Sequence, residues 1–345
     1  MKHIKKAAAL LLAVLLLLAG TAGCGTGAAE SSAPSAAVSS RAAAQKTQKP
    51  VLRLAALKGP TGIGMLKLMS DNDAGKTANA YKISLATSPD QIVAKISSGD
   101  ADAAAVPTNL AATLYNKTGG KFQLAAVNTL GVLYLLTTDP KIKTVKDLKG
   151  KTIASSGQGA TPEYAVNYIL KQNGLTPGKD VKVQYKAEHA ELAALMISGK
   201  AATAVLPEPF VTQVLAKNPK IRIALDLTKE WEKASKGKSA LAMGGLMVRR
   251  DFAEKNRAAF NKFLDEYKAS AEYATANVRQ TAALSGKYGI MPSAVAQKAI
   301  PNCSIVYIDG SGMKEKIPGF LKLLYEFNPK SVGGKLPKDD FYYQK

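Results

Sequence analysis

The chain has 345 residues, of which 46% are hydrophobic, and this proportion is typical of a globular protein with a substantial core. It holds only two cysteines and two histidines, which excludes a disulfide framework and any metal site built from several cysteines. The formal net charge is +21, but the lysines are scattered and no basic segment is interleaved with aromatic residues. The charge therefore argues against nucleic acid and indicates a basic surface that faces anionic lipid or cell wall.

The first 23 residues have the three parts of a secretory signal. Three lysines precede an apolar run over residues 7–19. The run is about 13 residues long, which is short for a hydrocarbon core about 30 Å thick. Thr21-Ala22-Gly23-Cys24 follows and resembles a bacterial lipoprotein cleavage site, although leucine usually stands in the place of Thr21. We predict a signal peptide over 1–23 and a chain lipid-anchored through Cys24 at the outer face of the cytoplasmic membrane; plain secretion and an uncleaved anchor are the alternatives.

Residues 24–49 are predicted to form a flexible tether, because they are rich in alanine, serine and glutamine and hold no aromatic residue. The region from Pro50 to Lys345 is long enough for two modest lobes or one large domain. No later stretch approaches 18 unbroken apolar residues, so we expect no second membrane segment.

Strands and helices alternate through the first half of this region. Strands are predicted over 51–57, 81–87 and 101–106, with a helix after the first of them. Ser88-Pro89-Asp90 opens the next helix, since serine is a good N-cap, proline suits the first helical position and aspartate the first turn. This alternation predicts an α/β fold with largely parallel sheets.

The second half repeats the pattern and suggests where the chain changes lobe. An apolar strand over 130–138 is expected to cross into the second lobe, and a strand over 241–248 is expected to return. Further strands are predicted over 181–185 and 221–227, and a long helical segment over 251–279. We expect the first lobe to comprise 50–136 and 240–345, and the second 137–239.

Two segments 100 residues apart resemble each other. Residues 94–107 and 194–207 share alanine, serine, glycine and proline at equivalent positions. In each copy a helix ends at glycine, a short strand follows and proline begins a loop. The repeat predicts two similar α/β lobes, each presenting a loop at the carboxyl end of a strand, where open α/β sheets bind ligands.

Two glycine-rich loops are candidate ligand contacts, because each precedes a helix whose N-terminal N–H groups and dipole favour negative charge. The second loop leaves alternatives open: Glu163 either complements the helix dipole or contacts ligand, and Tyr164 either stacks on a planar ligand or packs in the core. Neither loop has the lysine and hydroxyl residue of a P-loop. The candidates are Gly59, Pro60, Thr61 and Gly62 in the first loop, and Gly157, Gln158, Gly159, Ala160, Thr161, Glu163 and Tyr164 in the second.

Further candidates follow other predicted strands. Hydrogen bonds are available from Thr108 and Asn109, and Glu208 and Phe210 in the matching loop offer a carboxylate for an amine and a ring face. The remaining candidates are Asn128 and Thr129, before the first crossing, and Glu188 and His189, which either cap a helix or contact ligand. A catalytic triad or a histidine-based zinc site would depend on His189 alone, so we expect no enzyme, metal or cofactor.

Several of these segments together resemble a known group, the extracytoplasmic substrate-binding proteins of ABC importers in the nitrate, sulfonate, taurine and thiamine-precursor branch. The resemblance implies the type II periplasmic-binding-protein fold: two α/β lobes with mostly parallel sheets flanked by helices, joined by two crossover strands and closing on one small molecule. It also implies membrane permease subunits as partners and a monomeric binding protein. The segments are Cys24, GPTGIG at 59–64, DLKGKTIA at 147–154, GQGATPEY at 157–164, VLPEPF at 205–210 and VRRDFAEKN at 248–256.

We therefore expect solute capture for an ABC importer. Glycine-rich helix starts favour a sulfonate, whereas Glu163, Glu188 and Glu208 beside aromatic residues favour an aminated or aromatic heterocycle such as a thiamine-pyrimidine precursor. The proposed loops lack arginine, which weakens the case for a strong anion. The alternatives are an enzyme on the same fold, in pyrimidine-precursor or menaquinone biosynthesis, and a sensor lipoprotein that binds ligand without transport.

Overall fold

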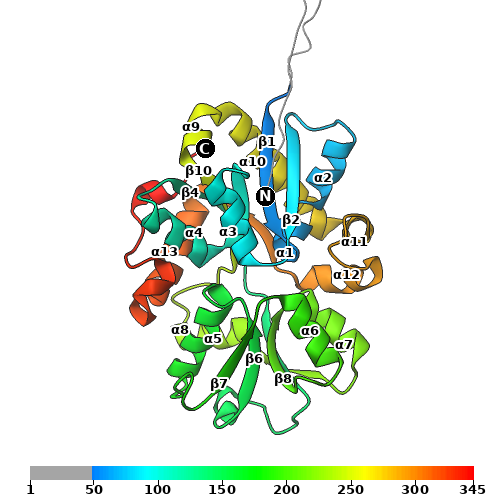
Figure 1. The fold of residues 1–345 in the computed structure, drawn as a ribbon, viewed down its shortest axis with the longest axis vertical. Coiled ribbons are helices and arrows are strands. Elements are labelled where there is room, and N and C mark those ends of the chain that lie inside the picture. Colours follow the sequence, from blue (N-terminus) through cyan, green and yellow to red (C-terminus); the bar gives the residue numbers. More distant parts are fainter. Residues whose placement is uncertain (1–48) are drawn as a thin grey trace, which may run out of the picture. The chain divides into compact units, whose positions relative to one another are not determined.

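The computed structural model describes residues 49–345 (Figure 1). Gln48–Lys345 forms one compact unit, which contains both sheets and every buried apolar cluster found in the described residues. We therefore expect this unit to fold by itself. The predicted signal peptide, Cys24 and most of the tether lie outside the described residues. Among the helices described, none has both the length and the apolar character that crossing a bilayer requires.

The first sheet has six strands in the order β11-β4-β10-β3-β1-β2. Its parallel strands are β1 (Val51–Leu57), β2 (Ala80–Ala86) and β3 (Ala103–Pro107). β10 (Gly244–Arg249) runs antiparallel to both β3 and β4 (Phe122–Thr129), and β11 (Ile305–Ile308) runs antiparallel to β4.

The second sheet has five strands in the order β7-β6-β8-β5-β9. Its strands β6 (Thr152–Ser156), β7 (Lys182–Lys186) and β8 (Thr203–Pro207) are parallel, whereas β5 (Leu133–Thr137) runs antiparallel to β8 and to β9 (Arg222–Asp226). The predicted two-lobed α/β fold is thus confirmed, with mixed sheets. β5 and β10 each follow a connection from the other lobe, so they begin between the lobes. They are therefore antiparallel to the strands that end there.

Two segments connect the sheets, residues 130–132 and residues 236–243. The strand expected over 130–138 is shorter, and the range 50–136 expected for the first lobe contains most of β5, which pairs in the second sheet. Gly131 approaches the second lobe closely, because a Cβ there would lie 2.2 Å from Thr228 Oγ1. Any larger residue at this connection would collide with α8 (Leu227–Ser235).

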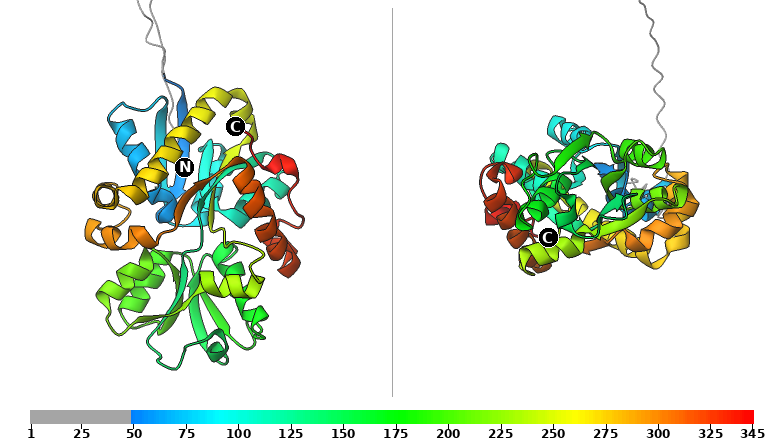
Figure 2. Two further views of the ribbon diagram at one scale, coloured as in Figure 1. Left: turned by 180° about the vertical axis from the view of Figure 1, so that it is seen from behind. Right: turned by 90° about the horizontal axis from the view of Figure 1, so that it is seen from below.

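The first sheet is flanked by helices from both halves of the chain. The long α10 crosses its back (Figure 2), where Phe260, Phe263 and Tyr267 pack against β-strand residues such as Leu54 and Leu246. The helices of this lobe are α1 (Pro60–Ile63), α2 (Leu66–Asp73), α3 (Pro89–Ser98), α4 (Thr108–Lys117), α9 (Arg250–Lys255), α10 (Arg257–Ala276), α11 (Val278–Lys287), α12 (Ser293–Ala299) and α13 (Gly310–Phe327), with short 3-10 turns η2 (Ile300–Asn302), η3 (Pro329–Val332) and η4 (Asp339–Phe341).

The long helical segment expected over 251–279 consists of α9, α10 and the start of α11. Asn256 and Asn277 leave the helical conformation, with φ of −124° and −123°. Asparagine competes for backbone hydrogen bonds and so readily ends a helix. The predicted helical segment is therefore present, but it is divided at both asparagines.

The second sheet carries α5 (Thr161–Gln172), α6 (His189–Ile197), α7 (Phe210–Lys217), α8 and the turn η1 (Val145–Leu148). No helix was predicted over α8, where the sequence is mostly polar. The Asp226 carboxylate caps it by accepting from the N–H groups of Thr228 and Lys229 at 3.0 and 3.3 Å. Its two large apolar side chains, Leu227 and Trp231, are buried, and Trp231 packs against Tyr168.

Candidate functional site

A cleft of about 70 Å³ lies between the two lobes, where β1, β3, β6 and β8 end. Four of its lining residues are prolines that come from four strand-to-helix turns, and the walls are mostly apolar. The first lobe contributes Leu57, Lys58, Gly59, Pro60, Thr61, Pro107, Thr129 and Gly244, the two connections contribute Val132 and Met243, and the second lobe contributes Pro162, His189, Pro207, Glu208 and Phe210.

The first glycine-rich loop folds back against the end of β1. The Thr61 hydroxyl donates to the Leu57 carbonyl at 3.2 Å. A Cβ at Gly62 would lie 2.6 Å from the same carbonyl oxygen, so only glycine permits this close turn. The turn brings Lys58 to the cleft, where it is partly buried and is the one lysine or arginine of the lining.

His189 enters the cleft from the first turn of α6. Its Nδ1 shares a hydrogen bond of 2.5 Å with Ser156 Oγ, and its ring centroid lies 5.6 Å from that of Phe210. Desolvation lowers the pKa of the imidazole to about 4, and the nearby charge of Glu188 opposes this shift only in part. His189 is therefore a neutral hydrogen-bonding group at neutral pH rather than a cation.

Glu208 lies at the end of β8 and is 3% exposed. Its two oxygens accept from the Thr212 N–H at 3.1 Å and from the Thr212 hydroxyl at 3.0 Å. Desolvation raises the pKa of the carboxyl, and the bonds from Thr212 oppose that shift. Among the described residues no lysine, arginine or histidine forms an ion pair with it. Glu208 thus caps α7 and also presents a buried carboxyl to the cleft.

Polar side chains beside the cleft join the two lobes directly. Thr161 Oγ1 of the second lobe donates to Asn109 Oδ1 of the first at 3.0 Å, and Asn109 Nδ2 donates to the Gly159 carbonyl at 3.2 Å. A second link runs from the Thr87 hydroxyl to Glu188 Oε1 at 2.8 Å. These contacts hold the lobes together without lining the cleft.

The structure distributes the predicted site residues in two groups. Gly59, Pro60, Thr61, Thr129, His189, Glu208 and Phe210 line the cleft. The others lie beside or behind it: Gly62, Thr108, Asn109, Asn128, Gly157, Gln158, Gly159, Ala160, Thr161, Glu163, Tyr164 and Glu188.

Within the second group, several side chains have structural partners. The Glu163 carboxylate accepts from the Gly159 N–H at 2.5 Å and so holds its own loop, Tyr164 packs against the core, and Gln158 is exposed. Thr108 and Asn128 are fully buried, and Thr108 Oγ1 and Asn128 Nδ2 find no hydrogen-bond partner among the described residues. Thr108 follows directly on β3, and Asn128 lies within β4 next to Thr129 of the lining.

Sequence reasoning missed half of the lining. Lys58 was not predicted as a ligand contact, because a lysine after a strand is most often a solvated surface residue. Its position just before the glycine-rich loop could have indicated that it lines the cleft. Pro162 was interpreted as a helix start, Pro107 and Pro207 were placed in the loops at the carboxyl ends of strands without being named as ligand contacts, and the residues of the returning connection gave no signal. The missed residues are Leu57, Lys58, Pro107, Val132, Pro162, Pro207, Met243 and Gly244.

The described residues contain no group of three or more histidine, cysteine, aspartate or glutamate side chains that could hold a metal ion. Cys303 is buried, and burial raises the pKa of its thiol, so it lacks the thiolate character of a reactive cysteine. The geometry is that of a binding cleft lined by apolar walls, one cation and one buried carboxyl.

Comparison with solved structures finds the same two-lobed architecture. The chain is 28% identical to an ABC transporter protein from Parabacteroides distasonis, over 86% of this chain and 99% of that one, with a TM-score of 0.70. The periplasmic aliphatic sulphonate binding protein of Escherichia coli is 17% identical over 85% and 92%, with a TM-score of 0.65. The periplasmic nitrate-binding protein of Synechocystis is 16% identical over 72% and 69%, with a TM-score of 0.55.

A search of curated proteins finds no match. A family model, in contrast, matches residues 82–276, which is more than half of the chain and includes strands and helices of both lobes. The model is described as ABC transporter, phosphonate, periplasmic substrate-binding protein. The chain therefore belongs to this family of extracytoplasmic, non-catalytic proteins, which capture a small-molecule substrate for an ABC importer.

Proposed function

We propose that the cleft captures a small organic zwitterion with an oxyanion at one end and an ammonium at the other, such as an aminoalkylphosphonate or aminoalkylsulfonate. One observation carries this proposal: a cation from the first lobe, Lys58, and a buried carboxyl from the second, Glu208, line the same cleft. A ligand with both charges would complement each group.

The oxyanion end is supported by Lys58 and by helix N-termini. α4, α6 and α7 begin at or beside residues of the lining, so their partial positive charges favour an anion there. His189 adds a hydrogen-bonding group without a second cation. Since the lining has no arginine, a singly charged group suits it better than a doubly charged one. The sulphonate-binding relative and the phosphonate family description agree with an oxyanion.

The ammonium end is supported by Glu208. A buried carboxylate without a cation is unfavourable, and a ligand ammonium would supply the missing partner. The proline-rich walls favour a short alkyl chain between the two charges, and they offer nothing to an inorganic anion such as nitrate. A cleft of about 70 Å³ also favours a small molecule.

An aminated heterocycle is the second candidate, and a specific contact favours it. The rings of His189 and Phe210 lie 5.6 Å apart beside Glu208, so a planar ligand could stack on Phe210 while its amino group meets the carboxylate.

Calorimetric titration of matched ligands would test the proposal. The series is aminoethylphosphonate and taurine, their amine-free partners ethylphosphonate and ethanesulfonate, ethylamine, and an aminopyrimidine. We expect the two zwitterions to bind most tightly. Glu208→Gln should weaken them about ten- to hundredfold and spare the amine-free anions, whereas Lys58→Met should weaken every oxyanion by a similar factor.

Exposed residues provide the matched controls, Lys82→Met and Glu191→Gln, which should leave all affinities unchanged. Equal affinity for ethylphosphonate and aminoethylphosphonate would contradict the ammonium site. Tight binding of the aminopyrimidine alone, lost in Glu208→Gln and retained in Lys58→Met, would establish the second candidate instead.

We also propose that the mature protein begins at Cys24, carries lipid there and uses residues 24–49 as a tether. The support is the sequence pattern of residues 1–24 together with an extracytoplasmic family. Metabolic labelling with a radioactive fatty acid tests this directly. Label should enter the wild-type protein and be absent from Cys24→Ser; a labelled variant or an unlabelled wild type would refute lipidation at this cysteine.

A further inference from the structure

The end of the second lobe that lies opposite the cleft is built from four segments of the chain. β6, β7, β8 and β9 all run in one direction and finish toward the cleft, while β5 runs the other way. The segments that lead into these strands, 138–151, 173–182, 198–202 and 217–222, therefore gather at the far end (Figure 1, bottom). We call this surface the basal end.

The basal end carries a concentrated positive charge. All its exposed lysines lack an ion-pair partner among the described residues, and they are Lys141, Lys143, Lys146, Lys149, Lys179, Lys182, Lys200, Lys217 and Lys220. The sequence suggested scattered lysines; the fold collects these nine on one surface.

The carboxylates of the basal end are already occupied. Asp139 pairs with Lys151 at 2.9 Å. Asp147 accepts from the N–H groups of Lys143 and Thr144 at 2.9 and 2.7 Å, and Asp180 accepts from the Thr176 N–H at 2.8 Å. Asp147 and Asp180 keep their charges, but they are two against nine lysines without an ion-pair partner, so the basal end carries a clear excess of positive charge.

Backbone contacts tie the four segments into one platform. The Gly150 N–H donates to the Asp180 carbonyl at 2.7 Å, and the Thr138 N–H donates to the Ala202 carbonyl at 3.0 Å. Arg222 Nη2 donates to the carbonyls of Asp139 and Ile142 at 2.8 and 2.7 Å. The lysines thus project from a fixed surface rather than from independent loops.

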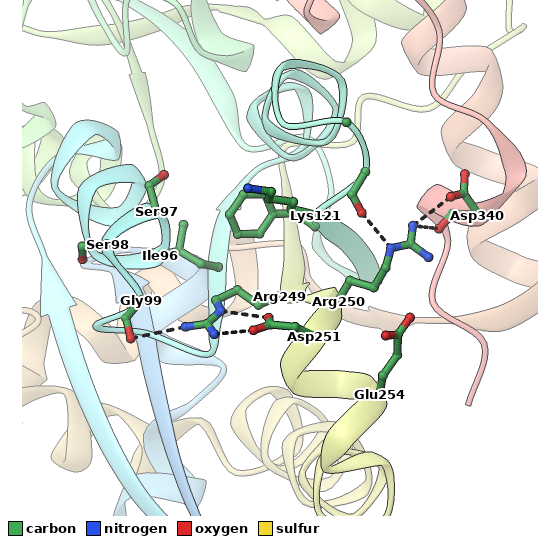
Figure 3. A pocket seen from close by; sticks show the side chains of 13 residues that line it. Ile96, Ser97, Ser98, Gly99, Lys121, Arg249, Arg250, Asp251, Glu254 and Asp340 are labelled. Atoms are coloured by element: carbon green, nitrogen blue, oxygen red, sulfur yellow. Dashed lines mark hydrogen bonds and ion pairs between the residues drawn. The ribbon is translucent and has the colours of Figure 1, made fainter.

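A groove of about 610 Å³ on the first lobe offers a contrast (Figure 3). There Arg249 pairs with Asp251 at 2.7 Å and Arg250 pairs with Asp340 at 2.9 Å, and Lys121 and Glu254 also line it. Positive and negative side chains balance, so this groove has no preference for a partner of one sign.

We propose that the basal end binds the anionic headgroup surface of a phospholipid bilayer. Lysine is a compact, strongly hydrated charge that suits contact with many headgroups rather than bidentate recognition of one. The nine lysines come with no exposed aromatic side chain for stacking on bases, which argues against single-stranded nucleic acid. An extracytoplasmic protein that serves a membrane importer has a bilayer within reach.

The proposed contact is electrostatic, so salt weakens it. The Debye length falls to about 8 Å at physiological ionic strength, which makes the contact reversible. Because the cleft lies at the opposite end of the same lobe, a protein resting on the bilayer in this way keeps its cleft away from the headgroups.

Vesicle sedimentation tests the proposal. The compact unit from Gln48 is used, because the lysines and apolar run of residues 1–19 would bind vesicles themselves. It is mixed with vesicles of phosphatidylglycerol and phosphatidylcholine, or of phosphatidylcholine alone. We expect salt-sensitive binding to the anionic vesicles only. The quadruple variant K141Q, K143Q, K146Q and K149Q should weaken it at least about tenfold, since each lysine near such a surface contributes several-fold.

A matched variant removes four exposed lysines of the first lobe, K255Q, K262Q, K268Q and K298Q, and so has the same net charge. It should weaken binding by less than about threefold. Equal losses in the two variants would overturn the proposal in favour of a net-charge effect, and equal sedimentation with both vesicle types would overturn it outright. The affinity of the quadruple basal-end variant for its ligand should stay at the wild-type value, which would show that this variant is folded. The vesicle result therefore does not depend on which substrate the cleft captures.

Discussion

The Thr161 hydroxyl of one lobe donates a hydrogen bond of 3.0 Å to the side-chain oxygen of Asn109 in the other. The amide nitrogen of Asn109 meanwhile donates to the carbonyls of Gly159 and Ser331 at 3.2 and 3.1 Å. Both side chains are fully buried. One amide therefore bonds to three groups from two parts of the chain, residues 159–161 and Ser331, and it can do so only while the lobes stand in their present arrangement.

Asn109→Ala should loosen this arrangement. The change leaves the Thr161 hydroxyl and the Gly159 carbonyl without their partner, while the Ser331 carbonyl keeps its hydrogen bond from the Thr113 hydroxyl. We therefore expect the free energy of unfolding to fall by about 1–3 kcal/mol. We also expect the radius of gyration from solution scattering to rise and amide exchange to speed up in residues 157–164.

Asn116→Ala is the matched control on the same helix. Asn116 Nδ2 donates to the carbonyls of Val332 and Lys335, both at 2.6 Å and both within the first lobe. This variant should lose stability without any change in the radius of gyration or in exchange over residues 157–164. If the two variants expand the protein equally, Asn109 has no special part in holding the lobes together.

Local patterns in the sequence predicted much of the fold. Proline after serine marked the start of α3, and the spacing of 100 residues between Pro107 and Pro207 matched β3 with β8, which end at equivalent places in the two sheets. These features depend on residues that are close in the chain, so propensity and capping express them directly.

The rest depends on contacts between distant residues. Nothing in the sequence indicates that Asn109 and Thr161 form a hydrogen bond with each other. Nor does the sequence indicate that the Glu163 carboxylate accepts a hydrogen bond from the Gly159 N–H of its own loop. Whether Lys58 lines a cleft or faces solvent likewise depends on which segment of the second lobe lies opposite it. Helix breaks at Asn256 and Asn277 were missed because the polar and apolar pattern continues through them.

Gly62→Ala should disrupt the first glycine-rich loop. A Cβ at Gly62 would lie 2.6 Å from the Leu57 carbonyl oxygen, and this backbone atom cannot move without displacing the end of β1 and Lys58. We expect ligand affinity to fall at least about tenfold and stability to fall by about 1–3 kcal/mol. Calorimetric titration and urea unfolding measure the two effects.

Gly64→Ala is the control in the same loop. Its Cβ would meet the Ile305 side chain at 3.4 Å, which is ordinary van der Waals contact. Affinity and stability should both stay close to those of the wild type. A Gly62→Ala protein that binds normally would show that the close turn does not position Lys58.

His189 should make stability depend on pH. Its pKa is lowered to about 4 in the folded protein, so the unfolded chain takes up a proton first as the pH falls below about 6.5. The folded state therefore loses stability as pH falls through the window from about 6.5 to about 4, and the loss between pH 7 and pH 5 should be about 2 kcal/mol.

Urea unfolding of the wild type and of His189→Gln over this range measures the effect. Carboxyl groups titrate in both proteins, so the difference between their slopes isolates the imidazole. The variant should lose the part of the slope that lies above pH 5. Parallel curves for the two proteins would mean that the folded protein protonates His189 at its ordinary pKa.

Glu208 should behave in the opposite sense. Desolvation raises the pKa of its carboxyl in the folded state, so its favourable contribution is fully present below the unfolded pKa and is lost as pH rises through the folded one. Glu208→Gln removes this loss. We expect the variant to gain stability over the wild type as pH rises from 4 toward 8, in urea unfolding without ligand, while Glu191→Gln, an exposed change, shows no such trend.

The same substitution should weaken binding of an amino-bearing ligand, so stability and affinity would move in opposite directions. This pattern is expected where a buried charge is retained for its function rather than for the fold. A Glu208→Gln protein that becomes less stable at high pH, with unchanged affinity, would instead assign Glu208 to the capping of α7 through Thr212 alone. Measured together, the two quantities separate a ligand contact from a structural cap, which affinity alone would not do.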